Sequence, residues 1–302
     1  MDPIRVVVRR GGIVESRHAV HAVVVQDGAV IAEAGDPMRV ALLRSAAKPF
    51  QALPLARVRD DLADEELAIA SASHRALPAQ LAAVRSLLAK APATEDELEC
   101  GTVGSEAGPT KLEHNCSGKH AGMLALCRAR GWESEGYRLA GHPVQEACTA
   151  EILSHADVRR DELETAVDGC GVVTFALPLE RMALLFARLE EADGGARVAA
   201  AMRAHPELIR GPGEPDTLLM QGLPGWTAKG GAEGLLCASG PASRSGGGAG
   251  LALKVADGAN RAVAPALAEL LRRLGLEAPG LGDAALVNSR GDHVGEVAAE
   301  VA

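Results

Sequence analysis

Residues 43–51 read Leu43-Arg44-Ser45-Ala46-Ala47-Lys48-Pro49-Phe50-Gln51 and contain the only Ser-x-x-Lys spacing in the chain. The mostly apolar residues 38–43 predict a strand that enters this segment, and the apolar residues after Lys48 predict a short helix. If the helix begins at Ser45, Lys48 lies one turn further along the same face, where a neutral amine could accept the serine proton. The spacing therefore indicates a nucleophile and its base. The same spacing also arises by chance, and Pro49 leaves the start of the helix open.

Strand-like segments lie at both ends of the chain, on either side of a helical middle part. They are dense in β-branched and apolar residues, and Asp27-Gly28 has the composition of a tight hairpin turn. The expected strands comprise residues 4–10, 18–26, 29–33, 227–239, 250–257 and 285–287. The strands on either side of a flexible linker, 244–249, should pair antiparallel. The expected fold class is therefore α+β, with an antiparallel sheet formed by the N- and C-terminal strands and helices packed around it.

The middle of the chain has the apolar periodicity of helices. The predicted helices cover residues 78–90, 143–156, 179–189, 196–204 and 261–274, and a further helix runs through Cys127 and Arg130 to end at Gly131. Residues 99–109 and 210–226 are rich in Gly or Pro and predict loops. Neither an internal repeat nor a disordered linker interrupts the sequence, so we expect a single domain over residues 1–302.

Composition excludes several kinds of function. The formal net charge of the 302-residue chain is −9 and aromatic residues make up only 2%. Without a run of Lys or Arg, nucleic acid is not an expected partner. No window approaches the roughly 18 apolar residues that span a bilayer, and the N-terminus lacks the pattern of a signal peptide. We therefore expect a cytoplasmic protein without a membrane partner. The six cysteines fit no disulfide framework in a chain of this length.

Two further clusters carry groups that are suited to chemistry. Ser73 and His74 end a short apolar run and could face a cleft. Equally, Ser73 could cap the helix predicted over residues 78–90. Cys116 and Cys170 each lie in a polar turn flanked by glycine, where ligands or reactive thiols are more typical than packing residues.

Several blocks of the sequence, read in order, carry a family resemblance. They are RSAAKPFQ (44–51), SASH (71–74), HNCSGKHAGML (114–124), DGCGVVTFALPL (168–179), HPEL (205–208) followed by KGGAEG (229–234), and GLALKVADG (250–258). In this order and nearly end to end, they resemble the asparaginase II family. The resemblance implies a fold similar to serine β-lactamases and glutaminases, hydrolysis of L-asparagine to L-aspartate and ammonia, and a homodimer.

The resemblance also implies two Ser-Lys pairs at the active site. The first pair is Ser45 with Lys48, the nucleophile and base already indicated by their spacing. The second serine is Ser73, and its lysine is Lys229 in the Lys-Gly-Gly block. Lys254 is the other candidate for that lysine, because the sequence does not settle which strand faces the cleft.

A zinc site is implied beside these pairs, with Cys116, Lys119 and Cys170 as ligands. Thiolates suit zinc, and three protein ligands leave a position for water or substrate. Residue types alone would favour His120 or Asp168 as the third ligand, because a lysine amine holds its proton tightly. The resemblance favours Lys119.

Arg44, His74 and Asp168 are expected to bind substrate. The chain departs from the family after the Ser-His dipeptide, where Arg75-Ala-Leu-Pro replaces the usual polar string. Two other functions stay open from the sequence. The same Ser-Lys groups could serve another acyl transfer, such as glutamine or β-lactam hydrolysis, or the chain could be a zinc-binding regulatory protein without turnover.

Overall fold

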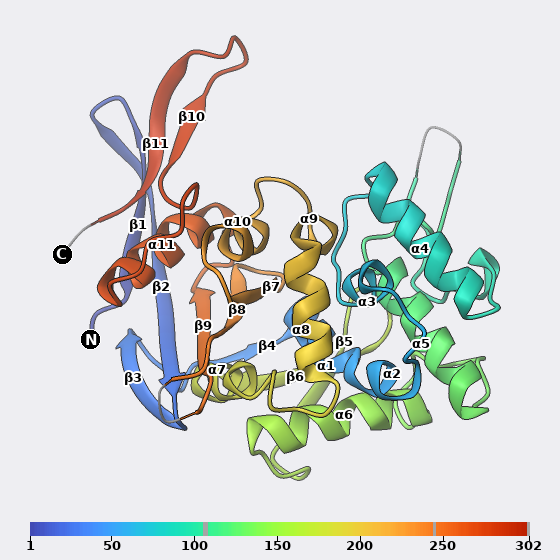
Figure 1. Cartoon of the computed structure of the whole chain (residues 1–302). Coiled ribbons are helices and arrows are strands. Elements are labelled where there is room, and N and C mark those ends of the chain that lie inside the picture. The colour runs from blue at the N-terminus through green and yellow to red at the C-terminus, as the bar shows by residue number, and fades with distance from the viewer. Residues whose placement is uncertain (105–107, 244–245, 301–302) are drawn as a thin grey trace.

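The computed structural model describes residues 1–104, 108–243 and 246–300. An antiparallel sheet lies at one side of the molecule and most of the helices lie at the other (Figure 1). The loops predicted over residues 99–109 and 244–249 each include residues outside the described part of the chain.

The main sheet has eight strands, and all of its pairings are antiparallel. In spatial order it contains β10 (Ala284–Val287), β11 (His293–Ala299), β1 (Ile4–Arg10), β2 (Ile13–Gln26), β9 (Ala249–Val255), β8 (Leu235–Gly240) and β7 (Thr227–Gly230), and β3 (Ala29–Ala34) also pairs with β2. N- and C-terminal strands therefore share one sheet, which confirms the predicted α+β class.

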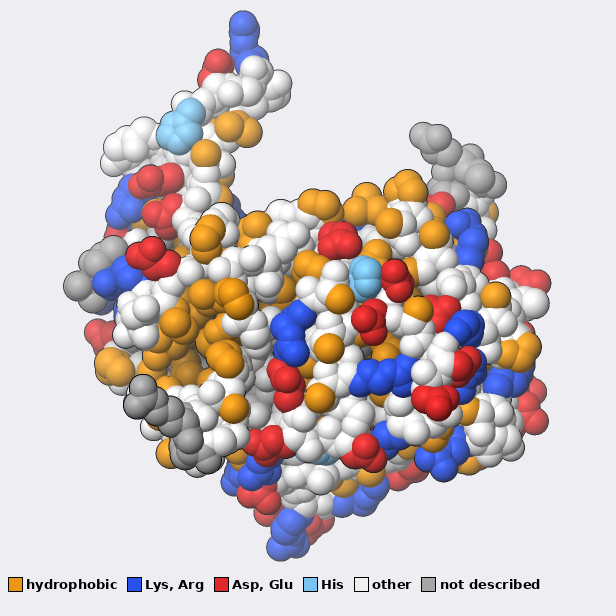
Figure 2. Space-filling model, in the orientation of Figure 1, with side chains coloured by type: hydrophobic (Ala, Val, Ile, Leu, Met, Phe, Trp, Pro, Cys, Tyr) orange, Lys and Arg blue, Asp and Glu red, His pale blue; other side chains and the backbone are white. Residues whose placement is uncertain are grey.

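Strand β2 joins the two halves of this sheet. One edge of β2 pairs first with β1, from Ile13 to Val20, and then with β3, from Ala22 to Gln26. Its other edge pairs with β9, where Val20 lies opposite Val255. The strands β10 and β11 extend beyond the body of the molecule as an arm, and Figure 2 shows acidic and basic side chains interspersed over the face in view.

A smaller antiparallel sheet and the helices make up the rest of the structure. The small sheet has the order β4 (Val40–Leu42), β6 (Val173–Pro178) and β5 (Glu164–Val167). The helices are η1 (Arg44–Ala47), α1 (Lys48–Gln51), α2 (Leu53–Val58), α3 (Asp64–Ala70), α4 (Pro78–Lys90), η2 (Glu95–Glu97), α5 (Ser117–Arg130), α6 (Pro143–Ala156), α7 (Leu179–Ala187), α8 (Gly195–Ala204), α9 (Pro206–Ile209), α10 (Pro215–Gly222), η3 (Asn260–Ala262) and α11 (Val263–Arg273).

Helix α5 is the buried centre of the helical part. Every residue from Ser117 to Cys127 is buried, as expected of a helix that other helices surround. Two glycines permit its close approach to α3: a Cβ on Gly118 would lie 2.2 Å from the Ile69 carbonyl oxygen, and one on Gly122 would lie 3.1 Å from the Ala70 Cβ. The Gly-Lys-His-Ala-Gly sequence therefore brings its lysine into the core.

Helix α7 packs on the sheet across β9, β2 and β8. The approach is closest at Gly250 of β9, where an added Cβ would lie 1.8 Å from the Ala183 carbonyl oxygen and 2.5 Å from the Ala187 nitrogen. This contact fixes one face of the sheet against the helical part of the molecule.

Most of the predicted elements are confirmed. The helices predicted over residues 78–90 and 143–156 are α4 and α6, with the same bounds. The loop prediction over 210–226 is wrong for Pro215–Gly222, because apolar residues after the proline are buried in α10 against β7. The single strand predicted over 227–239 is wrong, since it turns back on itself as β7 and β8, and β11 was missed. Among the described residues, no helix is both long and apolar enough to cross a membrane.

Replacing Gly250 with alanine should destabilise the fold. The new methyl group would meet backbone atoms of α7, which cannot move aside as a flexible side chain could, so the free energy of unfolding should fall by about 2 kcal/mol or more. Gly12→Ala is the control, because a Cβ there has open space around it. Urea denaturation measures both variants, and equal stability of the two would contradict the assigned packing of α7 on β9.

Candidate active site

A left-handed turn at Arg44 places Ser45 at the start of the first helices. Arg44 has φ of 49°, which is uncommon for a residue with a side chain. Two contacts hold it there: its backbone N–H donates to Thr174 Oγ1 at 3.0 Å, and its Nε donates to Asp168 Oδ1 at 2.5 Å. The turn ends β4 and begins η1, so the chain enters the helices directly at the predicted nucleophile.

Lys48 is buried at the junction of η1 and α1. Its side chain is 1% exposed, and its Nζ donates to the Ala72 carbonyl oxygen at 2.5 Å and to Ser73 Oγ at 2.9 Å. Burial lowers the pKa of this amine, and the charge of Cys116 only partly offsets that effect. Removal from water disfavours the ammonium form, so Lys48 is suited to act as a base.

Lys48 is hydrogen-bonded to Ser73, which was predicted to pair with Lys229 and not with Lys48. Ser45 is half-buried, and its hydroxyl has no hydrogen-bond partner within the described ranges. The alternative that Ser73 caps α4 is wrong. That helix begins after Leu77, and the Gln80 side chain accepts from the backbone N–H groups of Arg75 and Leu77 instead.

Lys229 lies on β7 and is fully buried. Its Nζ donates to the Gly230 carbonyl oxygen at 2.7 Å, and burial lowers its pKa well below the usual value. Its environment includes Lys48, whose charge acts in the same direction. Lys254 instead donates to the Glu233 carbonyl oxygen at 2.7 Å, and its charged neighbours belong to a different region. Of the two candidates, only Lys229 stands beside the other predicted groups.

The two cysteines predicted as ligands lie together with Lys119. Cys116, Lys119 and Cys170 are all buried, and Lys119 Nζ donates to Cys170 Sγ at 3.0 Å. A hydrogen bond from Cys170 lowers the pKa of Cys116 well below the usual thiol value, and the same bond raises the pKa of Cys170. The pair therefore shares one proton, with the negative charge on Cys116 facing two lysines.

These donors fit zinc in part. Thiolates are ligands that zinc prefers, and both sulfur atoms are present in one place. In the described part of the chain, no group of three or more His, Cys, Asp or Glu side chains is arranged to hold a metal ion. His120 is bonded through Nδ1 to the Tyr137 hydroxyl at 2.7 Å, and its buried Nε2 has no hydrogen-bond partner among the described residues. Asp168 is paired with Arg44. Lys119 and His120 therefore both stay candidates for the third ligand, and the family resemblance favours Lys119.

Both ring nitrogens of His74 are used within the protein. Its Nδ1 accepts from the Ala76 N–H at 3.1 Å, so its Nε2 carries the proton and donates to Ser117 Oγ at 2.8 Å. The Ser117 hydroxyl in turn donates to the Leu112 carbonyl oxygen at 2.7 Å. His74 would have to give up one of these bonds to contact substrate, and its predicted binding role stays a prediction.

Two charged residues that the sequence analysis did not single out lie beside Lys229. Asp216 Oδ2 is 3.9 Å from Lys229 Nζ, and Arg210 Nε is 3.4 Å from the same oxygen. Both fall in the segment Arg210-Gly-Pro-Gly-Glu-Pro-Asp216, where three charges within seven residues were the available signal.

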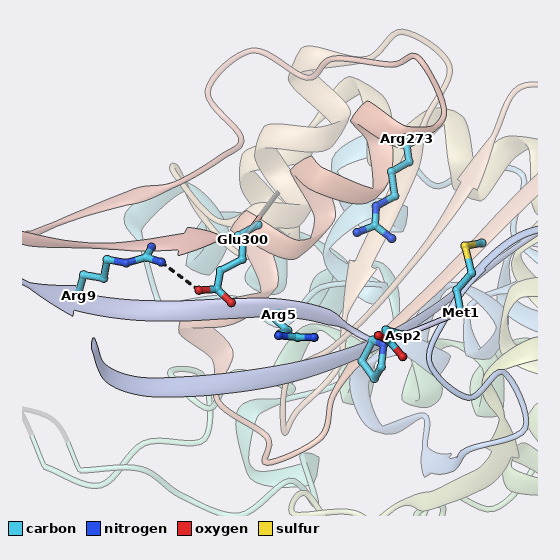
Figure 3. A pocket seen from close by; sticks show the side chains of 8 residues that line it. Met1, Asp2, Arg5, Arg9, Arg273 and Glu300 are labelled. Atoms are coloured by element: carbon cyan, nitrogen blue, oxygen red, sulfur yellow. Dashed lines mark hydrogen bonds and ion pairs between the residues drawn. The ribbon is translucent and has the colours of Figure 1, made fainter. Parts of the chain in front are cut away.

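A cavity of about 670 Å³ lies elsewhere, beside β1 and β11 (Figure 3). It is lined by residues that include Arg5, Arg9, Arg273 and Glu300. None of the predicted site residues lines it. The volume of a cavity therefore does not by itself locate the site in this fold.

The unfolding free energy should fall as the pH drops from about 6.5 to about 4. Burial, reinforced by the charge of Lys48, lowers the pKa of His74 to about 4, so in this window the unfolded chain binds a proton that the folded chain does not. The loss attributable to His74 is about 3 kcal/mol. Denaturation across this range should show a shallower slope for His74→Asn than for the wild type. The exposed His293 provides the control, and an equal slope in His74→Asn and His293→Asn would contradict the buried neutral His74.

A family model described as L-asparaginase II matches residues 6–299. A Bacillus glutaminase structure has a TM-score of 0.46 at 12% identity, covering 85% of this chain and 91% of its own. A structure of a protein called Mglu has a TM-score of 0.47 at 14% identity, with 86% and 66% covered. A β-lactamase from Sphaerobacter thermophilus has a TM-score of 0.39 at 16% identity, with 78% and 82% covered.

No curated protein sequence matches the chain significantly. The family model, however, spans nearly the whole chain, from the first strand of the main sheet to the last. The matched range includes the turn at Arg44, the buried lysines Lys48, Lys119 and Lys229, and the neighbouring Cys116 and Cys170. The chain therefore belongs to the L-asparaginase II family.

Proposed function

We propose that this amidohydrolase acts on L-asparagine, releasing L-aspartate and ammonia through an acyl-enzyme formed on Ser45. The observation that carries the proposal is the bonding of the Lys48 amine. Its two donated hydrogen bonds, to Ala72 and Ser73, account for both N–H groups of a neutral lysine. The lone pair of the amine is then left to accept the proton of the serine one turn before it.

The reaction proceeds in two stages. Ser45 Oγ bonds to the side-chain carbonyl carbon of asparagine while Lys48 takes the hydroxyl proton. The C–N bond then breaks, and the proton held by Lys48 is relayed through Ser73 and Lys229 to the departing nitrogen, which leaves as ammonia while Lys48 becomes neutral again. Water attacks the resulting ester and gives its proton to Lys48, which returns it to Ser45 Oγ as aspartate leaves. Backbone N–H groups would stabilise the oxyanion in both stages.

The ion pair beside Ser45 supports an amino-acid substrate. Arg44 and Asp168 bring a guanidinium and a carboxylate together next to the nucleophile, and the Arg44 side chain is 28% exposed. Such a pair can exchange its mutual contact for the α-carboxylate and α-ammonium groups of a free amino acid. We assign Arg44 and Asp168 to substrate binding on this basis, and the substrate-binding role of His74 stays a prediction.

Replacing each serine in turn distinguishes the nucleophile from the serine of the proton relay. Ser45→Ala should lower kcat by at least about a thousand-fold, because no acyl-enzyme can form. Ser73→Ala should lower it by about a hundred-fold, as expected for loss of a proton-transfer group. Rapid quenching during turnover followed by mass analysis should find the aspartyl ester on Ser45 in the wild type. An ester on Ser73 would overturn the assignment of the nucleophile.

The choice of substrate is tested by the same assay. Ammonia release should be faster from L-asparagine than from L-glutamine, and a chromogenic β-lactam should not be hydrolysed. A preference for glutamine would replace asparagine in the proposal and leave the acyl-enzyme chemistry in place. A homodimer remains a prediction from the family resemblance, and a cytoplasmic location remains a prediction from the composition of the sequence.

We assign zinc to Cys116, Cys170 and Lys119, since the two sulfur atoms and the amine already lie together. A bound zinc ion would supply a positive charge that keeps both sulfurs ionised and helps to orient the substrate. Lys119 would need to lose its proton to serve as a ligand, so binding should release protons.

Zinc content tests this site independently of activity. The purified wild-type protein should contain about one zinc ion per chain by atomic emission, and Cys116→Ser and Cys170→Ser should each lose most of it. Cys127→Ala is the control, because Cys127 is buried in α5 among apolar residues. Zinc retained in both serine variants, or lost equally in the control, would reject the assignment.

A further inference from the structure

We propose that Asp216 is a positioning residue for Lys229, whose amine it holds in place through a buried network with Arg210 and the Gly230 backbone. The inference rests on the proposed role of Lys229 in the proton relay and extends it to groups outside the two Ser-Lys pairs.

The contacts of Asp216 define the network. Asp216 is the second residue of α10 and is 1% exposed. Its Oδ2 accepts from the Gly230 N–H at 3.0 Å and lies 3.4 Å from Arg210 Nε and 3.9 Å from Lys229 Nζ. One carboxylate oxygen therefore connects a helix, a loop and the strand that carries the lysine.

The glycine after Lys229 makes this arrangement possible. A Cβ on Gly230 would lie 2.6 Å from Arg210 Nη2 and 3.3 Å from Asp216 Oδ2. A side chain at this position would therefore separate the carboxylate and the guanidinium from the strand. The glycine permits the protein's own charged groups to approach the backbone next to the lysine.

The charged groups around Lys229 explain why this lysine needs a negative charge nearby. The groups that act on the amine are Arg210, Asp216, Lys48 from α1 and Cys116, and the Cys237 thiol lies opposite on β8. Burial, Arg210 and Lys48 all favour the neutral amine, whereas Asp216 and Cys116 favour the ammonium. Asp216 is the only carboxylate among them. Without it, a buried amine would face two cations and keep a single hydrogen bond, to Gly230.

A second observation indicates that the network contains more than these side chains. Asp216 Oδ1 is buried and has no hydrogen-bond partner in the described part of the protein. Asp216, Arg210 and Gly230 also line a cavity of about 40 Å³. That volume accommodates a water molecule, and an unpaired carboxylate oxygen is the kind of group that retains one.

The test uses Asp216→Asn, which keeps the size of the side chain and removes its charge. Glu214→Gln is the matched control, because Glu214 also pairs with Arg210, at 3.8 Å, but makes no recorded contact with Lys229. The variant should lower kcat for asparagine at least ten-fold with KM within two-fold, since Asp216 acts through Lys229 and not on the substrate. The control should retain both constants within two-fold.

The pH dependence of kcat distinguishes a positioning role of Asp216 from a merely structural one. Loss of a negative charge about 4 Å away lowers the pKa of Lys229 further, so the basic limb of the kcat profile should move down by about one pH unit. An unchanged limb in Asp216→Asn, or an equal shift in Glu214→Gln, would overturn the proposal.

Direct titration separates this proposal from the proposed function. The chain has six lysines, so their ε-carbons can be labelled with 13C and followed by NMR, with Lys229→Met identifying the signal. In Asp216→Asn the midpoint of the Lys229 signal should fall relative to wild type, whether or not asparagine is the substrate. An unchanged midpoint would refute the role of Asp216 even in an active enzyme. A shifted midpoint in a protein without amidase activity would refute the proposed function alone.

Discussion

The candidate site depends on a lysine amine held out of water without a carboxylate partner. Lys48 donates to a backbone carbonyl and a serine hydroxyl, and the charged groups that influence it most are two cysteines and a second lysine. A carboxylate in contact would stabilise the ammonium, and the amine would then already be protonated and unable to accept the serine proton. The surrounding residues instead satisfy the hydrogen bonds of the amine while leaving its charged form unfavourable. The burial of η1 and α1 and the close packing of α5 on α3 keep this amine away from water.

Two layers of the fold meet around that amine. The helical layer supplies Lys48, Ser73 and Cys116, and the main sheet supplies Lys229 from β7. Cys170 comes from the turn between β5 and β6 of the smaller sheet. The layers are joined closely by α7 on β9 and by the second glycine after Lys229, where a Cβ on Gly231 would lie 3.0 Å from the Leu43 carbonyl oxygen. The left-handed backbone at Arg44 costs on the order of 1 kcal/mol and is held by an ion pair and a hydrogen bond.

Much of the fold could be predicted from the sequence, because its periodic segments are strong. Helix α4 and the N-terminal strands follow from apolar spacing alone. The strand β11 was missed, and α10 was hidden by the glycines and prolines that precede it. The site residues could be gathered only through the family resemblance, since residues as distant in sequence as Cys116 and Cys170 meet through tertiary packing. Which serine receives the Lys48 hydrogen bond depends on side-chain direction, which spacing does not determine.

The choice between Lys229 and Lys254 could not be made from the alternation of side chains along the strands. Lys229 pairs with Cys237, which pairs with Ala252, two residues before Lys254. Paired residues of antiparallel strands share a face, so both lysines lie on the same side of the sheet. They differ in their place along the sheet, which the alternation of side chains along a strand does not determine.

The shared sheet has a consequence for how the chain acquires its structure. Strands β1 and β2 are made first, but β9 and β11, which flank them, come after the helices that carry the candidate site. Until then, the outer edges of this hairpin are open, and such edges favour pairing with other chains. The nascent N-terminal hairpin is therefore exposed to aggregation until the C-terminal strands cover it.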